Sequence, residues 1–216
     1  MKVNFERILA VGAHLDDIEL GCGGFISKSK STCQIYILVL SSERRNSKGQ
    51  IQEKRKVEEA ISAIKKLGIN KNNFYLENIP SQLFDSHEQE IREILIKYNR
   101  KINPDLILCP SKNDVHQDHR ILCEQVNKVF KRKTQLGYEI INSSFSFLPQ
   151  LYIGLSKKDV ARKVLAVGCY KSQMDKKITT GDYFSKKVVE GLAISRGAKI
   201  GVSFAEAFEI YHFEII

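Results

Sequence analysis

The sequence predicts an α/β fold in which a mainly parallel sheet lies between two layers of helices. Short apolar runs alternate with stretches of helical periodicity along the 216 residues, which is typical of repeated βαβ units. The chain is long enough for one substantial core, and no repeat, low-complexity segment or linker divides it. We therefore expect a single Rossmann-like, three-layer α/β/α domain over residues 1–216.

The strands of this sheet are expected at the apolar runs. They are Arg7–Ala13, Gln34–Leu40, Asn73–Leu76, Asp105–Cys109, Tyr138–Ser143 and Ala205–Phe213. Right-handed crossovers place the C-terminal ends of parallel strands at one edge of a sheet. The loops after the first and fourth strands should therefore open on the same side. They are neighbours if these two strands flank a topological switch point, where open α/β sheets bind ligands.

Four helices are expected between and after these strands. Their ranges are 51–67, 86–98, 156–173 and 183–196. Capping boxes are predicted at two of the helix starts, at Ser86 with Gln89 and at Ser156 with Asp159. Gly68 provides a stop for the first helix.

Composition narrows the class of protein. The net charge is +9, but the basic residues come in short pairs without interleaved aromatic residues, so a nucleic-acid-binding protein is disfavoured. The surplus charge indicates a solvated surface or a field that attracts an anionic substrate. No apolar run reaches the length of a membrane span, and no signal peptide opens the chain, so we expect a cytoplasmic protein. Five cysteines without a CxxC pair indicate reduced thiols, with Cys22 the one placed near the polar clusters described next.

Two clusters of histidine and aspartate follow buried strands. His14, Asp16 and Asp17 come after the first strand and open a glycine-rich stretch, which we expect to be a loop. The second cluster, at residues 116–119, follows the fourth strand and reads HQDH. Two histidines and one aspartate would meet the three-ligand requirement of a catalytic zinc site, and a water in the open position becomes a nucleophile near neutral pH. The pieces fit metal-assisted hydrolysis of an amide, in which metal-bound water attacks the carbonyl, a carboxylate takes the proton and a histidine stabilises the oxyanion or protonates the leaving amine.

Each of these residues also has a plain structural explanation. Asp16 or Asp17 could cap the helix that follows, and His116 and Asp118 could be loop and N-cap residues. Two such clusters at strand ends that should meet are harder to explain in this way than either one alone.

The two clusters resemble the motifs of the PIG-L/LmbE family of zinc-dependent N-deacetylases. Residues 13–24 read AHLDDIELGCGG, which resembles the family pattern AHPDDxExGxGG, and HQDH resembles its HxDH motif. The stretches at 55–60 with 67–68, at 170–173 and at 196–208 are also similar to the family. The resemblance therefore spans nearly the whole chain and implies the family's LmbE-like fold.

The resemblance implies a metal site shared by the loops after the first and fourth strands. By position in the motifs, His14, Asp17 and His119 would bind Zn²⁺, or another divalent metal such as Fe²⁺, and Asp16 would be the general base. Leu15 stands where the family has proline, which changes the rigidity of the loop more than its chemistry.

The resemblance also implies the remaining roles. His116 would polarise the carbonyl or act as the acid, and Asp118 would orient His116. Arg55 and Arg196 would support substrate binding, and Glu19 would be structural.

The implied reaction is removal of the acetyl group from an N-acetylglucosamine-like sugar on an unknown, possibly anionic, carrier. The partners would be a small N-acetylated amino sugar or glycoconjugate and a second copy in a homo-oligomer, with no nucleic acid. Two alternatives stay open, namely an amidase that removes a larger acyl group and a non-catalytic domain that binds a sugar or nucleotide.

Overall fold

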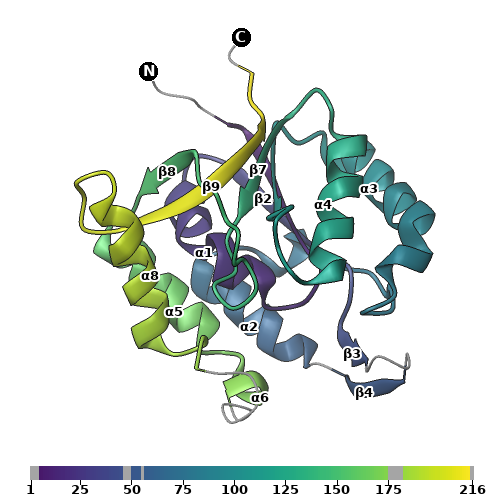
Figure 1. The fold of residues 1–216 in the computed structure, drawn as a ribbon, viewed down its shortest axis with the longest axis horizontal. Helices are drawn as coiled ribbons and strands as arrows, with labels where there is room; N and C mark the ends of the chain where they lie inside the picture. Colours follow the sequence, from purple (N-terminus) through teal and green to yellow (C-terminus); the bar gives the residue numbers. More distant parts are fainter. Residues whose placement is uncertain (1–4, 46–49, 55, 175–181, 215–216) are drawn as a thin grey trace.

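The computed structural model describes residues 5–45, 50–54, 56–174 and 182–214, and it centres on a seven-stranded sheet (Figure 1). The strand order is β5-β2-β1-β6-β7-β9-β8. The bounds are β1 Arg7–Gly12, β2 Gln34–Val39, β5 Phe74–Leu76, β6 Leu106–Pro110, β7 Thr134–Tyr138, β8 Leu151–Gly154 and β9 Ala205–His212. A separate two-stranded sheet pairs β3 (Glu43–Arg45) with β4 (Ile51–Lys54).

The sheet is mostly parallel and contains the expected switch point. β1 pairs in parallel with both β2 and β6, and β5 and β7 extend the parallel part on either side. The chain moves from β1 outward through β2 to β5 and then returns to the other side of β1 at β6, so the loops after β1 and β6 are neighbours. β9 runs antiparallel to β7 and β8 at the far edge. The predicted α/β class and mainly parallel sheet are confirmed.

Helices cover both faces of the sheet. In Figure 1, α3 (Glu88–Ile102) and α4 (Gln117–Val129) lie on one face, and α1 (Asp17–Ser29), α2 (Val57–Leu67), α5 (Lys157–Val167) and α8 (Lys186–Ala198) lie on the other. The short α6 covers Lys171–Met174, and the 3-10 turns η1 and η2 cover Lys71–Asn73 and Phe84–His87. Two large apolar clusters fill the spaces between the layers, because side chains of β1 and β6 alternate between the two faces. No described helix has the length and hydropathy needed to span a bilayer.

Several predicted boundaries are wrong. The strand expected at Tyr138–Ser143 is instead β7, which ends at Tyr138; the backbone N–H groups of Ser143 and Ser144 then donate to Ile140 and form a turn. β7 is not recognisable as an apolar run because it contains Thr134, Gln135 and Gly137, although the whole strand is buried.

The helices also differ at their ends. The helix expected at 51–67 begins at Val57, since residues 51–54 form β4. The box expected at Ser86 does not form, and α3 starts at Glu88. The box at Ser156 and Asp159 does form, but α5 ends at Val167. The expected helix 183–196 is α8.

The glycine-rich stretch expected to be a loop lies within α1. A Cβ atom on Gly21 would come within 2.1 Å of the Tyr138 ring, and one on Gly24 within 2.5 Å of Leu155. The Tyr138 hydroxyl also donates to the carbonyl of Val11 at 2.8 Å. These glycines therefore let α1 pack closely against the sheet, and the start of the helix lies at the end of β1.

The middle of α1, just after its kink at Cys22, is held by a buried ion pair. Glu206, on β9, accepts hydrogen bonds from the backbone N–H groups of Gly24 and Phe25 at 2.8 and 2.6 Å. Lys163, on α5, donates to the same carboxylate at 2.7 Å, and both side chains are buried. The pair ties α1, α5 and β9 together behind the loop that carries His14.

Candidate metal centre

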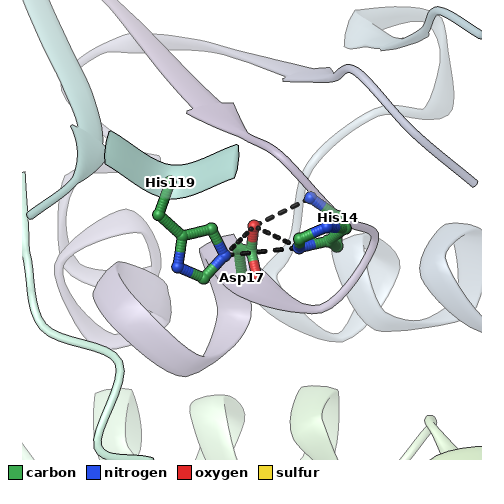
Figure 2. A group of neighbouring side chains, drawn as sticks. All are labelled: His14, Asp17 and His119. Atoms are coloured by element: carbon green, nitrogen blue, oxygen red, sulfur yellow. Dashed lines mark hydrogen bonds and ion pairs between the residues drawn. The ribbon is translucent and has the colours of Figure 1, made fainter. Parts of the chain in front are cut away.

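The loops after β1 and β6 bring three ligand-type side chains together. His14 follows β1, Asp17 is the first residue of α1, and His119 lies in the first turn of α4 (Figure 2). His14 Nδ1 is 3.3 Å from His119 Nε2 and 3.5 Å from Asp17 Oδ2, and His119 Nε2 is 3.3 Å from the same oxygen. All three residues are buried. Three electron-pair donors therefore converge on one point.

The other nitrogen of each histidine faces a carboxylate. His14 Nε2 is 3.1 Å from Asp118 Oδ2, and His119 Nδ1 is 3.0 Å from Asp114 Oδ2. A carboxylate on the outer nitrogen keeps the ring proton there and turns the lone pair of the inner nitrogen toward a metal ion. In this arrangement both histidines present lone pairs to the point where Asp17 also presents its oxygen.

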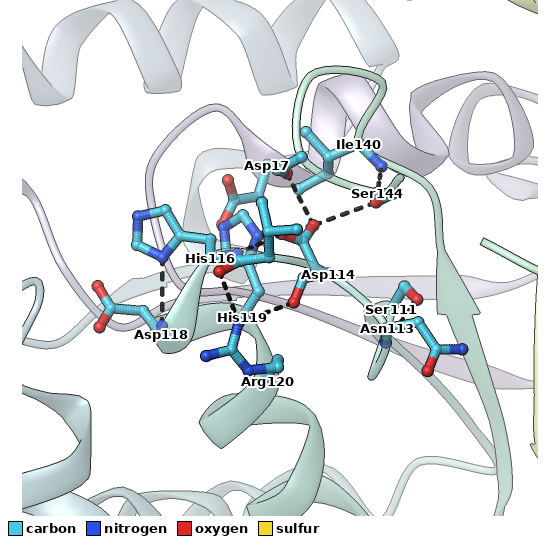
Figure 3. A network of polar contacts seen from close by, with 12 residues as sticks. Asp17, Ser111, Asn113, Asp114, His116, Asp118, His119, Arg120, Ile140 and Ser144 are labelled. Atoms are coloured by element: carbon cyan, nitrogen blue, oxygen red, sulfur yellow. Dashed lines mark hydrogen bonds and ion pairs between the residues drawn. The ribbon is translucent and has the colours of Figure 1, made fainter. Parts of the chain in front are cut away.

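Asp114 is itself fixed by several donors. Its Oδ2 accepts hydrogen bonds from the hydroxyls of Ser143 and Ser144 at 2.8 and 3.1 Å, and its Oδ1 accepts from the backbone N–H of His116 at 2.8 Å (Figure 3). The segment after β7 therefore supports His119 through Asp114.

The charges around this point favour a cation. Burial opposes ionisation of Asp17, but His119 and His14 outweigh it and hold the pKa of Asp17 well below its ordinary value. Burial also disfavours a charged His119, yet Asp17 and Asp114 raise its pKa to about 10. Both effects show that positive charge between these groups is stabilised.

The arrangement fits a tetrahedral metal ion. Zinc–nitrogen distances of about 2.05 Å and tetrahedral angles place neighbouring ligand atoms about 3.4 Å apart. The three separations here are 3.3, 3.3 and 3.5 Å. Two imidazoles and one carboxylate are a donor set that zinc uses in catalytic sites, with a fourth position left for water or substrate. Thus His14, Asp17 and His119 could hold zinc.

Asp16 and His116 border these donors. Asp16 is buried at the N-cap position of α1, but its side chain makes no capping hydrogen bond, so helix capping does not explain it. His116 is the N-cap of α4, and its Nδ1 accepts from the backbone N–H of Asp118 at 3.2 Å. Burial, followed by the nearby His14 and His119, lowers the pKa of His116 to about 3, so its ring is neutral.

Asp118 contacts a different histidine from the one expected. The resemblance assigned it to orient His116, but its carboxylate lies against His14 and also accepts from the backbone N–H of Gln82 at 2.7 Å. Its backbone N–H donates to His116 Nδ1 at 3.2 Å, and one carboxylate oxygen lies within 4.8 Å of ligand atoms of both His14 and His116. The His14 ring therefore lies between two carboxylates, with Asp118 at Nε2 and Asp17 at Nδ1.

Arg196, one of the two arginines expected to support substrate binding, is held by a carboxylate outside this cluster. Arg196 forms a two-point pair with Glu139, with nitrogen–oxygen distances of 2.9 and 2.5 Å, and lies over the ring of Phe147. Arg55 lies outside the described residues. Leu15, at the family's proline position, packs in the core, and its carbonyl accepts a hydrogen bond from Tyr170. Cys22 is a core residue whose thiol contacts the carbonyl of Ile18.

Asp114 is the residue that the sequence analysis missed. It stands five positions before His119 in the same polar loop, and that spacing alone does not show which side chain it faces. The available signal was a third carboxylate in a loop already assigned to a metal, since histidine ligands usually require a hydrogen-bond acceptor on their outer nitrogen.

The fold and the donor set define an α/β protein with a candidate metal site, and comparisons with known proteins identify its family. The model of the PIG-L family, described as GlcNAc-PI de-N-acetylase, matches residues 9–130, more than half of the chain and both histidine clusters. The chain therefore belongs to the PIG-L family of deacetylases.

Individual proteins and solved structures are similar to this chain over most of its length. The uncharacterized deacetylase YaiS of Escherichia coli (strain K12) is 28% identical over 180 residues, which cover 77% of this chain and 91% of YaiS. The N,N'-diacetylchitobiose deacetylase of Pyrococcus horikoshii has a similar structure, with a TM-score of 0.71 at 20% identity over 97% of this chain and 86% of its own. GalB of Pseudomonas putida KT2440, a 4-carboxy-2-hydroxymuconate hydratase, is similar as well, with a TM-score of 0.73 at 16% identity over 98% of each chain. At these identities, the structural likenesses show the fold alone.

Proposed function

We propose that this protein is a metal-dependent hydrolase that removes the acetyl group from an N-acetylated, glucosamine-like sugar. The observation that carries the proposal is the convergence of His14, Asp17 and His119, with a carboxylate behind each histidine. Membership of the PIG-L family and the chitobiose activity named for the Pyrococcus protein support an N-acetyl sugar as the substrate.

Zinc is the metal that this donor set suits best, and when bound it would polarise the amide carbonyl and increase the acidity of water. His14, Asp17 and His119 would hold it. Asp118 and Asp114 would keep the ring protons of the two histidines on their outer nitrogens.

Asp16 and His116 would move the protons. The buried Asp16 carboxylate, next to the ligand Asp17, accepts a proton from the attacking water as the amide carbon becomes tetrahedral. His116 Nδ1 already accepts a hydrogen bond, so the proton of its neutral ring resides on Nε2. That N–H can donate to the carbonyl oxygen as negative charge develops there. The proton held by Asp16 is then available to the leaving amine.

A panel assay with purified protein tests the proposal. We expect about one zinc per chain, as three protein ligands imply, and release of acetate from a methyl N-acetylglucosaminide. The Asp16→Ala variant should keep its zinc and lose roughly 10²- to 10⁴-fold in turnover, the usual range for a general base. The His14→Ala variant should lose the zinc, whereas Asp85→Ala, which changes an exposed carboxylate on η2, should alter neither.

The panel also separates the alternatives. Longer acyl chains on the same sugar test an amidase for larger groups, and hydration of an unsaturated dicarboxylate tests chemistry like that named for GalB. If zinc binds but no amide is cleaved, the deacetylase proposal fails.

A further inference from the structure

A buried tyrosine contacts the loop that carries the candidate ligands. Tyr170 lies between α5 and α6 and is 2% exposed. Its hydroxyl donates a hydrogen bond to the backbone carbonyl of Leu15, and Glu19 also hydrogen-bonds to this hydroxyl. Leu15 stands between the ligand His14 and Asp16, the proposed general base. A residue far away in the sequence therefore holds the backbone of the loop beside the metal centre.

Tyr170 is itself fixed by the elements around it. Its backbone N–H donates to the carbonyl of Val167 at 3.2 Å, and its carbonyl accepts from the N–H of Gln173 at 3.0 Å. The backbone N–H and the hydroxyl of Ser172 donate to the two carboxylate oxygens of Glu59, on α2, at 3.1 and 2.6 Å. The tyrosine ring packs in the larger apolar cluster of the core. The hydroxyl is therefore presented from a rigid position and can restrain the loop that it contacts.

The hydrogen bond to Leu15 restrains a whole peptide plane. The Leu15 carbonyl and the Asp16 N–H belong to one planar unit, so a donor that fixes the direction of the carbonyl also fixes where the Asp16 Cα lies. On the other side of Asp16, its own carbonyl accepts from the N–H of Leu20, in α1, at 3.1 Å. The backbone of Asp16 is thus held from both sides, by Tyr170 before it and by α1 after it.

The ligands next to Asp16 are held by other contacts. The His14 N–H donates to the Asp17 carboxylate at 2.8 Å, and the His14 ring lies against Asp118. Asp17 is the first residue of α1. Loss of the Tyr170 hydroxyl should therefore leave these ligands in place and loosen the residue between them.

We propose, resting on the proposed function, that Tyr170 is a positioning residue whose hydroxyl acts through the Leu15 peptide to place the Asp16 carboxylate for proton transfer. A general base has to lie within hydrogen-bond reach of the proton that it accepts. A displacement of about 1 Å at such a group costs on the order of 10²-fold in rate. A purely structural hydroxyl, which only satisfies a buried carbonyl, would affect stability without changing turnover.

Replacing Tyr170 by phenylalanine separates these roles, because the ring stays and the hydroxyl is lost. In the Tyr170→Phe variant we expect about one zinc per chain, as in the unaltered protein. For methyl N-acetylglucosaminide, kcat should fall roughly 10- to 100-fold and KM should change by less than about twofold. Tyr98→Phe is the matched control, because Tyr98 is also buried and donates to Glu77 at 2.9 Å, in the apolar cluster on the other face of the sheet. The control should keep the kcat of the unaltered protein.

A double variant tests whether Tyr170 acts through Asp16. In the Asp16→Ala background there is no carboxylate to place, so adding Tyr170→Phe should lower kcat by less than about a further twofold. An equally large loss in both backgrounds overturns the proposal. An unchanged kcat in Tyr170→Phe also overturns it, and so does loss of zinc, since the hydroxyl would then hold the ligands.

Failure of the proposed function can be told apart from failure of this inference. If the unaltered protein hydrolyses no substrate of the panel, the deacetylase proposal fails. Crystal structures of the unaltered protein and of Tyr170→Phe then decide the positioning role. A Leu15–Asp16 peptide that turns in the variant supports it, and an unchanged peptide overturns it.

Discussion

Replacing Asp114 by asparagine tests whether the carboxylates behind the histidines determine metal affinity. The Asp114 carboxylate accepts from two serine hydroxyls and faces His119 Nδ1 at 3.0 Å. Asparagine can keep Oδ1 in place for the backbone N–H of His116, which puts its NH₂ group where Oδ2 now lies. His119 Nδ1 would then meet a donor instead of an acceptor. The proton of the ring would move to Nε2, the nitrogen that faces Asp17 and the metal position.

The magnitude follows from that change of tautomer. A hydrogen bond to a charged group contributes about 1.5–3 kcal/mol, and one between neutral groups about 0.5–1.5 kcal/mol. The variant therefore loses about 1–2 kcal/mol of support for the metal-binding tautomer. We expect the zinc dissociation constant to rise about 5- to 30-fold, since each 1.4 kcal/mol is a factor of about ten, which overlaps the usual range for removing such a partner.

A competition titration with a chromophoric zinc chelator at pH 7.4 measures this constant directly. Ser144→Ala removes one hydrogen bond to Asp114 and keeps the carboxylate, so it should weaken zinc binding less than Asp114→Asn does. Asp85→Asn, an exposed carboxylate on η2, is the control for the general loss of one negative charge. If Asp114→Asn binds zinc as tightly as the Asp85→Asn control, the assignment of Asp114 as the partner of His119 is refuted.

Three further predictions concern stability, each measured by urea unfolding. Burial raises the pKa of Glu19 to about 8. The contribution of the protonated Glu19 to stability is therefore present below pH ~4.5 and is lost as the pH rises through ~8. Glu19→Gln should lessen the fall in the free energy of unfolding between pH 5 and 8.5 by several kcal/mol, and an unchanged slope contradicts this. Gly21→Ala should lower the free energy of unfolding by about 1–3 kcal/mol or more, because the added Cβ meets the Tyr138 ring. Gly191→Ala on α8, where a Cβ would have no atom within 4 Å, should be neutral or stabilising. Equal effects of the two variants would refute the packing argument. Lys163→Met leaves its buried carboxylate partner unpaired and should cost about 3–5 kcal/mol, so a loss below 1 kcal/mol would show that the pair is dispensable.

The parts of the fold that could be predicted are the buried strands that consist almost entirely of apolar residues. β1, β2 and β6 are covered on both faces, so they appear as continuous apolar runs with clear ends. β7 is equally buried but includes Thr134, Gln135 and Gly137. The Nε2 of Gln135 donates to the carbonyl of Phe130, and Gly137 makes room for Tyr211. Such compensation depends on residues distant in space, and local periodicity does not reveal it.

The candidate site follows the same division. Both histidine clusters could be recognised because each lies at the end of an apolar strand, and parallel topology brings those ends together. Which carboxylate serves which histidine could not be deduced, since His14 and Asp118 are 104 residues apart and their contact depends on how α4 starts. The family resemblance implied that Asp118 orients His116, whereas in the structure its carboxylate lies against His14 across the two loops.

The wrongly predicted end of β7 concealed the turn at Ile140 and the contacts that follow from it. Had residues 138–143 continued as a strand, Ile141 and Ser143 would have pointed to the same face of the sheet, and neither would have reached the loop after β6. The chain instead turns at Ile140, which sends Ser143 and Ser144 to the Asp114 carboxylate and leaves Phe145 exposed. The support of the metal ligand therefore arises from this turn. A change that restored strand geometry there should remove both serine hydrogen bonds to Asp114 and weaken zinc binding.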